Sequence, residues 1–152
     1  MKRTAFLIIG ATAAFAAMAT AGTTTPDDVT FDDYGAVSAS LTGVAGDAAN
    51  GRKLFANRKL GNCLACHQNN DYLEQSFHGE VGPSLDGAGD RWNEAELRGL
   101  VSNAKNTFEG TIMPAFYRTS GFYRNMEKFD GKSILSAQDV EDIVAYLLTL
   151  TE

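Results

Sequence analysis

The chain has 152 residues, with 13 Lys and Arg, 19 Asp and Glu, and a formal net charge of −6 at pH 7. This acidic balance argues against binding to nucleic acid, whose phosphates need a basic surface, and against binding to anionic membrane surfaces. It leaves room for a partner protein with a basic docking patch, because complementary charge speeds encounter.

The first 21 residues predict an export signal. Lys2 and Arg3 precede an apolar run, and Ala19-Thr20-Ala21 has the small-residue pattern of a cleavage site. An uncleaved membrane anchor is the alternative, but the apolar run is near the lower length limit for spanning and is diluted by Thr and Gly. We therefore expect residues 1–21 to be removed, leaving 11 basic and 19 acidic residues and a net charge of −8.

Residues 22–45 predict an N-terminal extension without regular structure. The segment is rich in Thr, Asp, Ala, Ser and Gly, so we expect it to be ordered only if it lies against the domain or a partner. Its four clustered acids are either a docking element or a solvated acidic tail; they are Asp27, Asp28, Asp32 and Asp33. One folded domain is expected over residues 46–152.

The first helix is predicted from Ala48 to Arg58, with Asp47 as its N-cap. Gly51 lies one turn before the apolar Phe55. A glycine inside a helix costs about 1 kcal/mol relative to alanine. We therefore expect another helix to cross this one closely at Gly51.

The run Cys63-Leu64-Ala65-Cys66-His67 has the C-x-x-C-H spacing of a c-type haem attachment site. Each thiol can form a thioether with one haem vinyl group, and His67 can then ligate the iron. A thioredoxin-like redox pair would need a βαβ context, and a zinc site would need four N or S ligands with only His78 left to add. We predict one covalent haem c, bound through Cys63 and Cys66, which are the only two cysteines.

A glycine-proline loop follows His67 by fifteen residues and runs from Gly82 to Gly87. Glycine allows close approach to a flat ligand, and the carbonyl of Pro83 is free to accept a hydrogen bond from the His67 ring. Such a bond would fix the tautomer of the iron ligand. An ordinary surface turn is the alternative reading of these residues.

Two further helices are predicted, Glu94 to about Asn103 and Ala137 to Leu150. Each is preceded by a capping box, Asn93 to Glu96 and Ser136 to Asp139. The sequence shows no strand-like alternation of any length. It therefore predicts an all-α fold in which a few short helices and long loops wrap around the haem.

The sixth iron ligand is expected to be Met113, because Pro114 stiffens the chain beside its sulfur. Met126 lies in a polar stretch, and His78 lies on the loop that should stay on the His67 side. These two residues, and an open coordination site, remain alternatives. A His/Met pair leaves iron without an open position and points to electron transfer.

With these motifs the chain resembles class I cytochromes c over residues 46–152. It resembles more narrowly the X-subunit family of the thiosulfate-oxidising Sox system. The segments that carry the narrower resemblance are Gly61–His67, Gly82–Leu85, Met113–Arg118, the insert Phe122–Ile134 and Asp142–Leu147.

This resemblance implies a periplasmic heterodimer with a haem-bearing A subunit. In that family, thiosulfate is oxidatively joined to a cysteine of a sulfur-carrier protein, an L-cysteine S-thiosulfotransferase activity that releases two electrons. The A subunit carries the bond-making chemistry, so no catalytic residue is expected in this chain. Its haem would accept electrons and pass them to a small cytochrome c.

Aromatic and arginine residues are concentrated after Met113, a composition enriched at protein interfaces. They are Tyr117, Arg118, Phe122, Tyr123 and Arg124. Contact with the A subunit and wrapping of the haem are two readings of equal weight. The competing function is a free periplasmic monohaem shuttle, which would have no need of the insert before the last helix.

Overall fold

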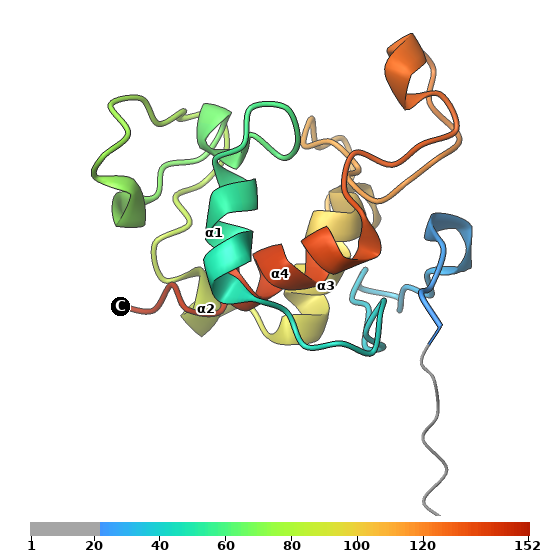
Figure 1. Ribbon diagram of the computed structural model, residues 1–152, viewed down its shortest axis with the longest axis horizontal. Coiled ribbons are helices and arrows are strands. Elements are labelled where there is room, and N and C mark those ends of the chain that lie inside the picture. The colour runs from blue at the N-terminus through green and yellow to red at the C-terminus, as the bar shows by residue number, and fades with distance from the viewer. Residues whose placement is uncertain (1–21) are drawn as a thin grey trace, which may run out of the picture.

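The computed structural model describes residues 22–152, so the predicted signal over residues 1–21 lies outside the described part. The helices are α1 (Ala48–Phe55), α2 (Ala88–Arg91), α3 (Glu94–Asn103) and α4 (Ala137–Leu147), joined by long loops that contain short 3-10 turns (Figure 1). Residues 22–152 contain no β-strand and no helix long and apolar enough to cross a membrane. The predicted all-α class is confirmed.

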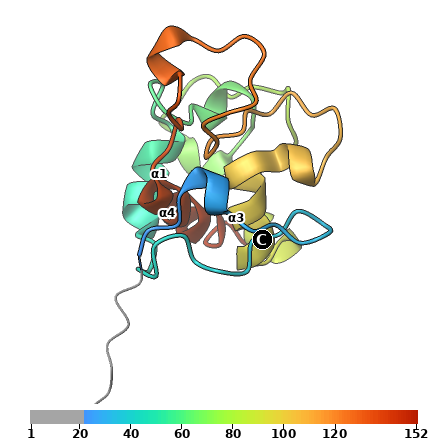
Figure 2. The same ribbon diagram turned by 90° about the vertical axis from the view of Figure 1, so that its right-hand side faces the viewer.

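The centre of the fold is the crossing of α1 over α4, which both views show (Figure 1, Figure 2). A Cβ atom placed on Gly51 would lie 2.9 Å from the Cβ of Tyr146 and closer still to the carbonyl oxygen of Asp142. The predicted reason for a glycine inside this helix is therefore confirmed. Phe55 packs beside the crossing, with its ring centroid 5.5 Å from that of Tyr146.

The first helix is shorter than predicted, because it ends at Phe55 and not at Arg58. Asp47 caps its start as expected by accepting the backbone N–H groups of Ala49 and Asn50. At the other end, Asn57 uses its carbonyl and its side chain to build a turn, since it accepts N–H groups from Leu60, Asn62 and Lys59. Asparagine side chains compete with helical bonding in this way.

Helices α3 and α4 begin where the sequence predicts, each with a complete capping box. Helix α4 ends at Leu147, one turn before the predicted Leu150. Beyond this end the backbone N–H groups of Thr149 and Leu150 bond three residues back and not four. The N–H and the Oγ1–H of Thr149 both donate to the Tyr146 carbonyl. The prediction of the last turn was wrong because these bonds replace the helical pattern.

The N-terminal extension lies against α3 and α4 (Figure 2). Val37 and Leu41 are 2% and 1% exposed, so they belong to the core. The extension therefore contributes to the domain, which composition alone did not indicate. Its four acids serve partly as local turn partners; Asp32, for example, accepts the N–H groups of Tyr34 and Ala36.

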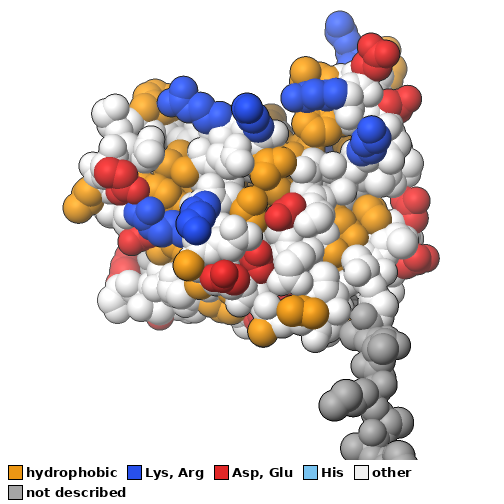
Figure 3. Space-filling view, in the orientation of Figure 1, with side chains coloured by type: hydrophobic (Ala, Val, Ile, Leu, Met, Phe, Trp, Pro, Cys, Tyr) orange, Lys and Arg blue, Asp and Glu red, His pale blue; other side chains and the backbone are white. Residues whose placement is uncertain are grey.

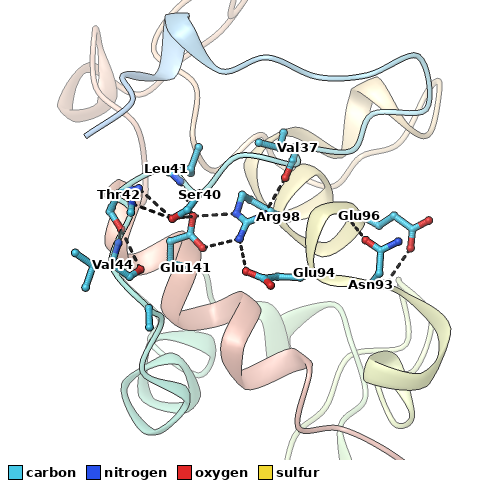
Figure 4. A network of polar contacts seen from close by, with 12 residues as sticks. Val37, Ser40, Leu41, Thr42, Val44, Asn93, Glu94, Glu96, Arg98 and Glu141 are labelled. Carbon is cyan, nitrogen blue, oxygen red and sulfur yellow. Dashed lines mark hydrogen bonds and ion pairs between the residues drawn. The ribbon is translucent and has the colours of Figure 1, made fainter. Parts of the chain in front are cut away.

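A buried ion pair fastens this extension (Figure 4). Arg98 of α3 donates from Nε to Glu141 of α4 over 2.9 Å and from Nη1 to the Val37 carbonyl over 2.9 Å. Glu141 in turn accepts the Leu41 N–H over 2.7 Å and the Ser40 hydroxyl over 3.2 Å. Two helices and the extension thus share one polar cluster inside the apolar core.

Candidate haem site

Three backbone hydrogen bonds join residues 64–68, which carry most of the C-x-x-C-H motif, to residues 79–85, which contain the start of the glycine-proline loop. Gly79 N–H donates to the Leu64 carbonyl, Gly82 N–H to Cys66 and Leu85 N–H to Gln68, over 2.8, 2.7 and 2.9 Å. The loop therefore runs alongside residues 64–68. This pairing of two segments fixes where the two residues between Gly82 and Leu85 can place their carbonyls. The first of these residues is Pro83.

The carbonyl oxygen of Pro83 lies 2.7 Å from Nδ1 of His67. A carbonyl oxygen can only accept, so Nδ1 must carry the proton and donate it. The neutral imidazole then has its lone pair on Nε2, which is the nitrogen available to a metal. The geometry therefore prepares His67 as a ligand, although its role as the axial ligand stays a prediction.

Gly82 brings the loop close to the ring. A Cβ atom at Gly82 would lie 2.7 Å from Nδ1 and 2.8 Å from Nε2 of His67. No side chain fits there without displacing the imidazole. The sequence predicted close approach of this glycine to a flat ligand; the close neighbour that the structure shows is the His67 ring.

Cys63 begins a short 3-10 turn, Cys63–Ala65, and Cys66 follows it directly, so that the two thiols come from one turn. Both are half-buried, and Cys63 packs against the hydrophobic core. Burial raises the pKa of the Cys63 thiol to about 12. The unattached thiol is therefore protonated at neutral pH and is a poor nucleophile for disulfide exchange.

The segment after His67 is anchored to α1 and α4 through buried polar groups. The amide of Asn69, which is fully buried, donates to the Tyr146 hydroxyl over 2.9 Å, and that hydroxyl donates to Asp71 over 2.9 Å. Burial raises the pKa of Asp71, but hydrogen bonds from Arg52 and Tyr146 outweigh it and hold the pKa below its usual value. The chain leaving His67 is thereby fixed to the helix crossing.

The three candidates for the sixth ligand occupy different surroundings. Met113 is half-buried against the hydrophobic core, whereas Met126 is 62% exposed, as its polar context predicted. His78 has both ring nitrogens engaged, since Nδ1 accepts the Asn69 N–H over 3.3 Å and Nε2 donates to the Tyr72 carbonyl over 3.2 Å. Met113 remains our proposed ligand.

These residues fit a c-type haem. They offer two thiols on one turn, an imidazole with Nε2 unprotonated, and a thioether packed against the core. Exposed apolar side chains precede the glycine-proline loop and Met113, with Val81 63% and Ile112 78% exposed, and an apolar ring system suits such neighbours. Within residues 22–152, no three His, Cys, Asp or Glu side chains are grouped to hold a bare metal ion.

The sequence did not predict which side chains hold the glycine-proline loop in place. Arg91 donates to the carbonyls of Ser84 and Asp86, while the Asp86 carboxylate accepts the backbone and side-chain N–H groups of Asn70. In the sequence, only the positions of Asp86 after Ser84-Leu85 and of Arg91 five residues later hint at these contacts. They join the loop to the chain beyond His67.

Comparison with known proteins identifies the class. The Cytochrome c family model matches residues 48–151, so the chain belongs to the cytochrome c family. This match confirms the prediction of one covalent haem c.

The particular likeness is to SoxXA from P. pantotrophus, one solved chain of which is 50% identical. The alignment covers 86% of this chain and 99% of that chain with a TM-score of 0.80, which confirms the predicted X-subunit family. The cytochrome SorU from Sinorhizobium meliloti is 25% identical over 68% of this chain and 90% of that one, with a TM-score of 0.45. No curated protein matched the chain.

Proposed function

We propose that this chain is the monohaem, electron-relaying subunit of a SoxXA-type complex, with a SoxA-type haem subunit as its partner. The observation that carries the proposal is the 50% identity to a chain of SoxXA, which extends over 86% of this chain and 99% of that chain. The site chemistry supports it, because a His/Met pair leaves haem iron suited to electron transfer.

The chain's own residues limit it to a relay role. Both cysteines are used in haem attachment, so no thiol remains to form a bond with sulfur. A single haem carries one electron at a time, whereas joining thiosulfate to a carrier-protein cysteine releases two. We therefore assign the bond-making step of the thiosulfotransferase to the partner. This chain hands electrons on singly to a small cytochrome c.

The proposed partner contact is narrower than the sequence indicated. Tyr117 is 5% exposed and its hydroxyl donates to the Thr24 carbonyl over 2.6 Å, so it anchors the extension and is not available to a partner. Beyond it, the loop of residues 119–132 projects from the body in both views (Figure 1, Figure 2). Tyr123 at 97% and Met126 at 62% exposure are its apolar contact candidates.

The charge near the haem attachment differs from the charge of the whole chain. Residues 48–70 contain four Lys or Arg and no Asp or Glu. Figure 3 shows basic side chains gathered along the upper edge of the molecule, where α1 ends and the projecting loop begins. A partner that docks at this edge is expected to be acidic, even though the complete chain is acidic itself.

Co-expression with a SoxA-type subunit tests the assignment. We expect a stable heterodimer and haem reduction by thiosulfate only when both the partner and the carrier protein are present. A monomeric holoprotein that the partner does not retain would favour the free shuttle. A colourless product would remove the cytochrome assignment.

The contact surface is tested by the exchange Tyr123→Ser together with Met126→Ser. We expect the affinity for the partner to fall by about tenfold or more, since exposed aromatic anchors dominate many interfaces. The exchange Tyr34→Ser is the matched control, because Tyr34 is 84% exposed on the extension. Loss of binding in the control alone would move the interface to the extension.

We also propose export to the periplasm with cleavage after Ala21, on the sequence pattern of residues 1–21. The mass of the protein purified from the periplasmic fraction measures this directly. A product beginning at Gly22 is expected. A product that keeps residues 1–21 and is found in the membrane fraction would show that this segment is an uncleaved anchor and not a cleaved signal.

A further inference from the structure

One lysine contacts the backbone of the methionine loop at two points. Nζ of Lys105 lies 2.9 Å from the carbonyl oxygen of Thr111 and 2.9 Å from that of Met113. An ammonium group has three donors, so it can serve both carbonyls and leave the third proton to water. Neither acceptor carries a charge, which sets this contact apart from an ordinary surface ion pair.

Lys105 itself is held by the end of α3. It lies in the 3-10 turn Ala104–Asn106, where its N–H donates to the Asn103 side chain over 3.3 Å. Ala104 beside it is fully buried, and the Ala104 carbonyl accepts the Phe108 N–H over 2.9 Å. The lysine stem therefore starts from a rigid element and reaches across to a loop.

Backbone bonds hold the loop at its two ends, from Thr111 N–H to the Phe108 carbonyl over 3.3 Å and from Tyr117 N–H to the Ser102 carbonyl over 3.0 Å. Met113 N–H donates to Oγ1 of Thr111 over 3.2 Å, which closes residues 111–113 into a small turn. With its carbonyl on Lys105, both backbone polar groups of Met113 are engaged, and Pro114 fixes the next φ angle. Within residues 111–113, the two bonds from the ammonium group are the contacts that tie the backbone carbonyls of the loop to the turn after α3.

We propose that Lys105 is a positioning residue for the Met113 sulfur, holding the ligand loop closed through hydrogen bonds to the Thr111 and Met113 carbonyls. The inference rests on the proposed role of Met113 as the axial ligand and is independent of the partner subunit. It predicts that loss of the ammonium group loosens the sulfur from the iron without removing the haem, which is attached elsewhere.

Imidazole competition in the ferric holoprotein tests this inference. Imidazole displaces a thioether from haem iron, and the near-infrared thioether-to-iron band reports how much sulfur remains bound. In Lys105→Leu, we expect the apparent affinity for imidazole to rise about tenfold, because two charge-assisted bonds no longer hold the loop. Lys105→Arg should return the affinity to within about twofold of wild type, since a guanidinium can also donate to two carbonyls.

Lys132→Leu is the matched control, because Lys132 is an exposed lysine with no side-chain hydrogen bond among the described contacts. It should titrate like wild type. Wild-type imidazole affinity in Lys105→Leu would overturn the proposal, and so would a failure of arginine to rescue. If the leucine variant yields no holoprotein, Lys105→Gln serves instead. An unchanged imidazole titration in that variant would likewise overturn the proposal.

Urea unfolding of the same variants separates positioning from general stabilisation. A purely structural lysine would lower stability and leave the imidazole affinity unchanged, which would contradict the proposal. Absence of the near-infrared band from the wild type would remove the ligand assignment and this inference together. Heterodimer formation is measured separately and is unaffected by that result.

Discussion

The exchange Arg98→Met tests the buried ion pair that joins the extension to α3 and α4. Arg98 and Glu141 are 2% and 4% exposed, and methionine preserves the unbranched apolar stem of the arginine. The exchange removes two hydrogen bonds to Glu141, of 2.9 and 3.0 Å, and leaves the carboxylate with only the Leu41 N–H and the Ser40 hydroxyl. A buried charge without its counter-ion is strongly unfavourable.

We expect the free energy of unfolding to fall by about 3 kcal/mol, the low end of the range for breaking a buried pair, because two neutral donors still serve the carboxylate. That is a large part of the about 5–15 kcal/mol available to a domain. The measurement is urea unfolding of the holoprotein, followed by helical circular dichroism and by haem absorbance. Guanidinium is avoided because its ionic strength screens charges.

Two further variants serve as controls for the Arg98→Met exchange. The double variant Arg98→Met with Glu141→Gln removes the charge and keeps an acceptor for the Leu41 N–H, so it should recover about 1–2 kcal/mol of the loss. Glu94→Gln should cost less than about 1 kcal/mol, since this second partner of Arg98 is on the surface. A single variant as stable as wild type, or a double variant no better than the single, would refute the account.

Three other predictions concern the helix crossing and the extension. Gly51→Ala should lower the free energy of unfolding by about 1–3 kcal/mol, because the added Cβ meets Tyr146 and α4 must move away. Burial raises the pKa of Asp142, but hydrogen bonds from neighbouring donors outweigh it and leave the folded pKa below its usual value. The ionised group therefore stabilises the fold above about pH 4, and this contribution is lost as the pH falls through the folded pKa, so Asp142→Asn should flatten the stability curve in acid. Tyr117→Phe should cost about 1 kcal/mol and speed proteolysis of the extension, because the bond to the Thr24 carbonyl is lost.

Each of these has a contrary result. Gly22→Ala is the control for the glycine exchange, since a Cβ there meets nothing within 4 Å; equal losses at Gly51 and Gly22 would count against close helix packing. An acid unfolding curve identical in Asp142→Asn and wild type would remove that carboxylate from the pH dependence. Unchanged protease sensitivity in Tyr117→Phe would mean that other contacts hold the extension.

The sequence by itself determined the attachment motif and the starts of the helices. C-x-x-C-H is contiguous, so its chemistry can be identified without a fold. Capping at Asp47, Asn93 and Ser136 depends on side chains bonding to N–H groups two or three residues away, which is also local. Gly51 indicated a close helix crossing, and the resemblance to class I cytochromes c implied the last helix as its partner, which the glycine alone did not identify.

Only the tertiary structure decided which distant segments meet. Three contacts join residues that are separated by a loop or by a whole helix. The backbone bonds between residues 64–68 and 79–85 bring the Pro83 carbonyl to His67. Lys105 bonds to the Met113 loop, and Arg98 pairs with Glu141 inside the core. An extension rich in Thr, Asp and Gly was expected to order only against the domain or a partner, and the structure shows the first of these, with Val37 and Leu41 buried in the core. The composition of a segment indicates how readily water solvates it. Whether the segment becomes ordered depends on the surface that the rest of the fold offers for packing.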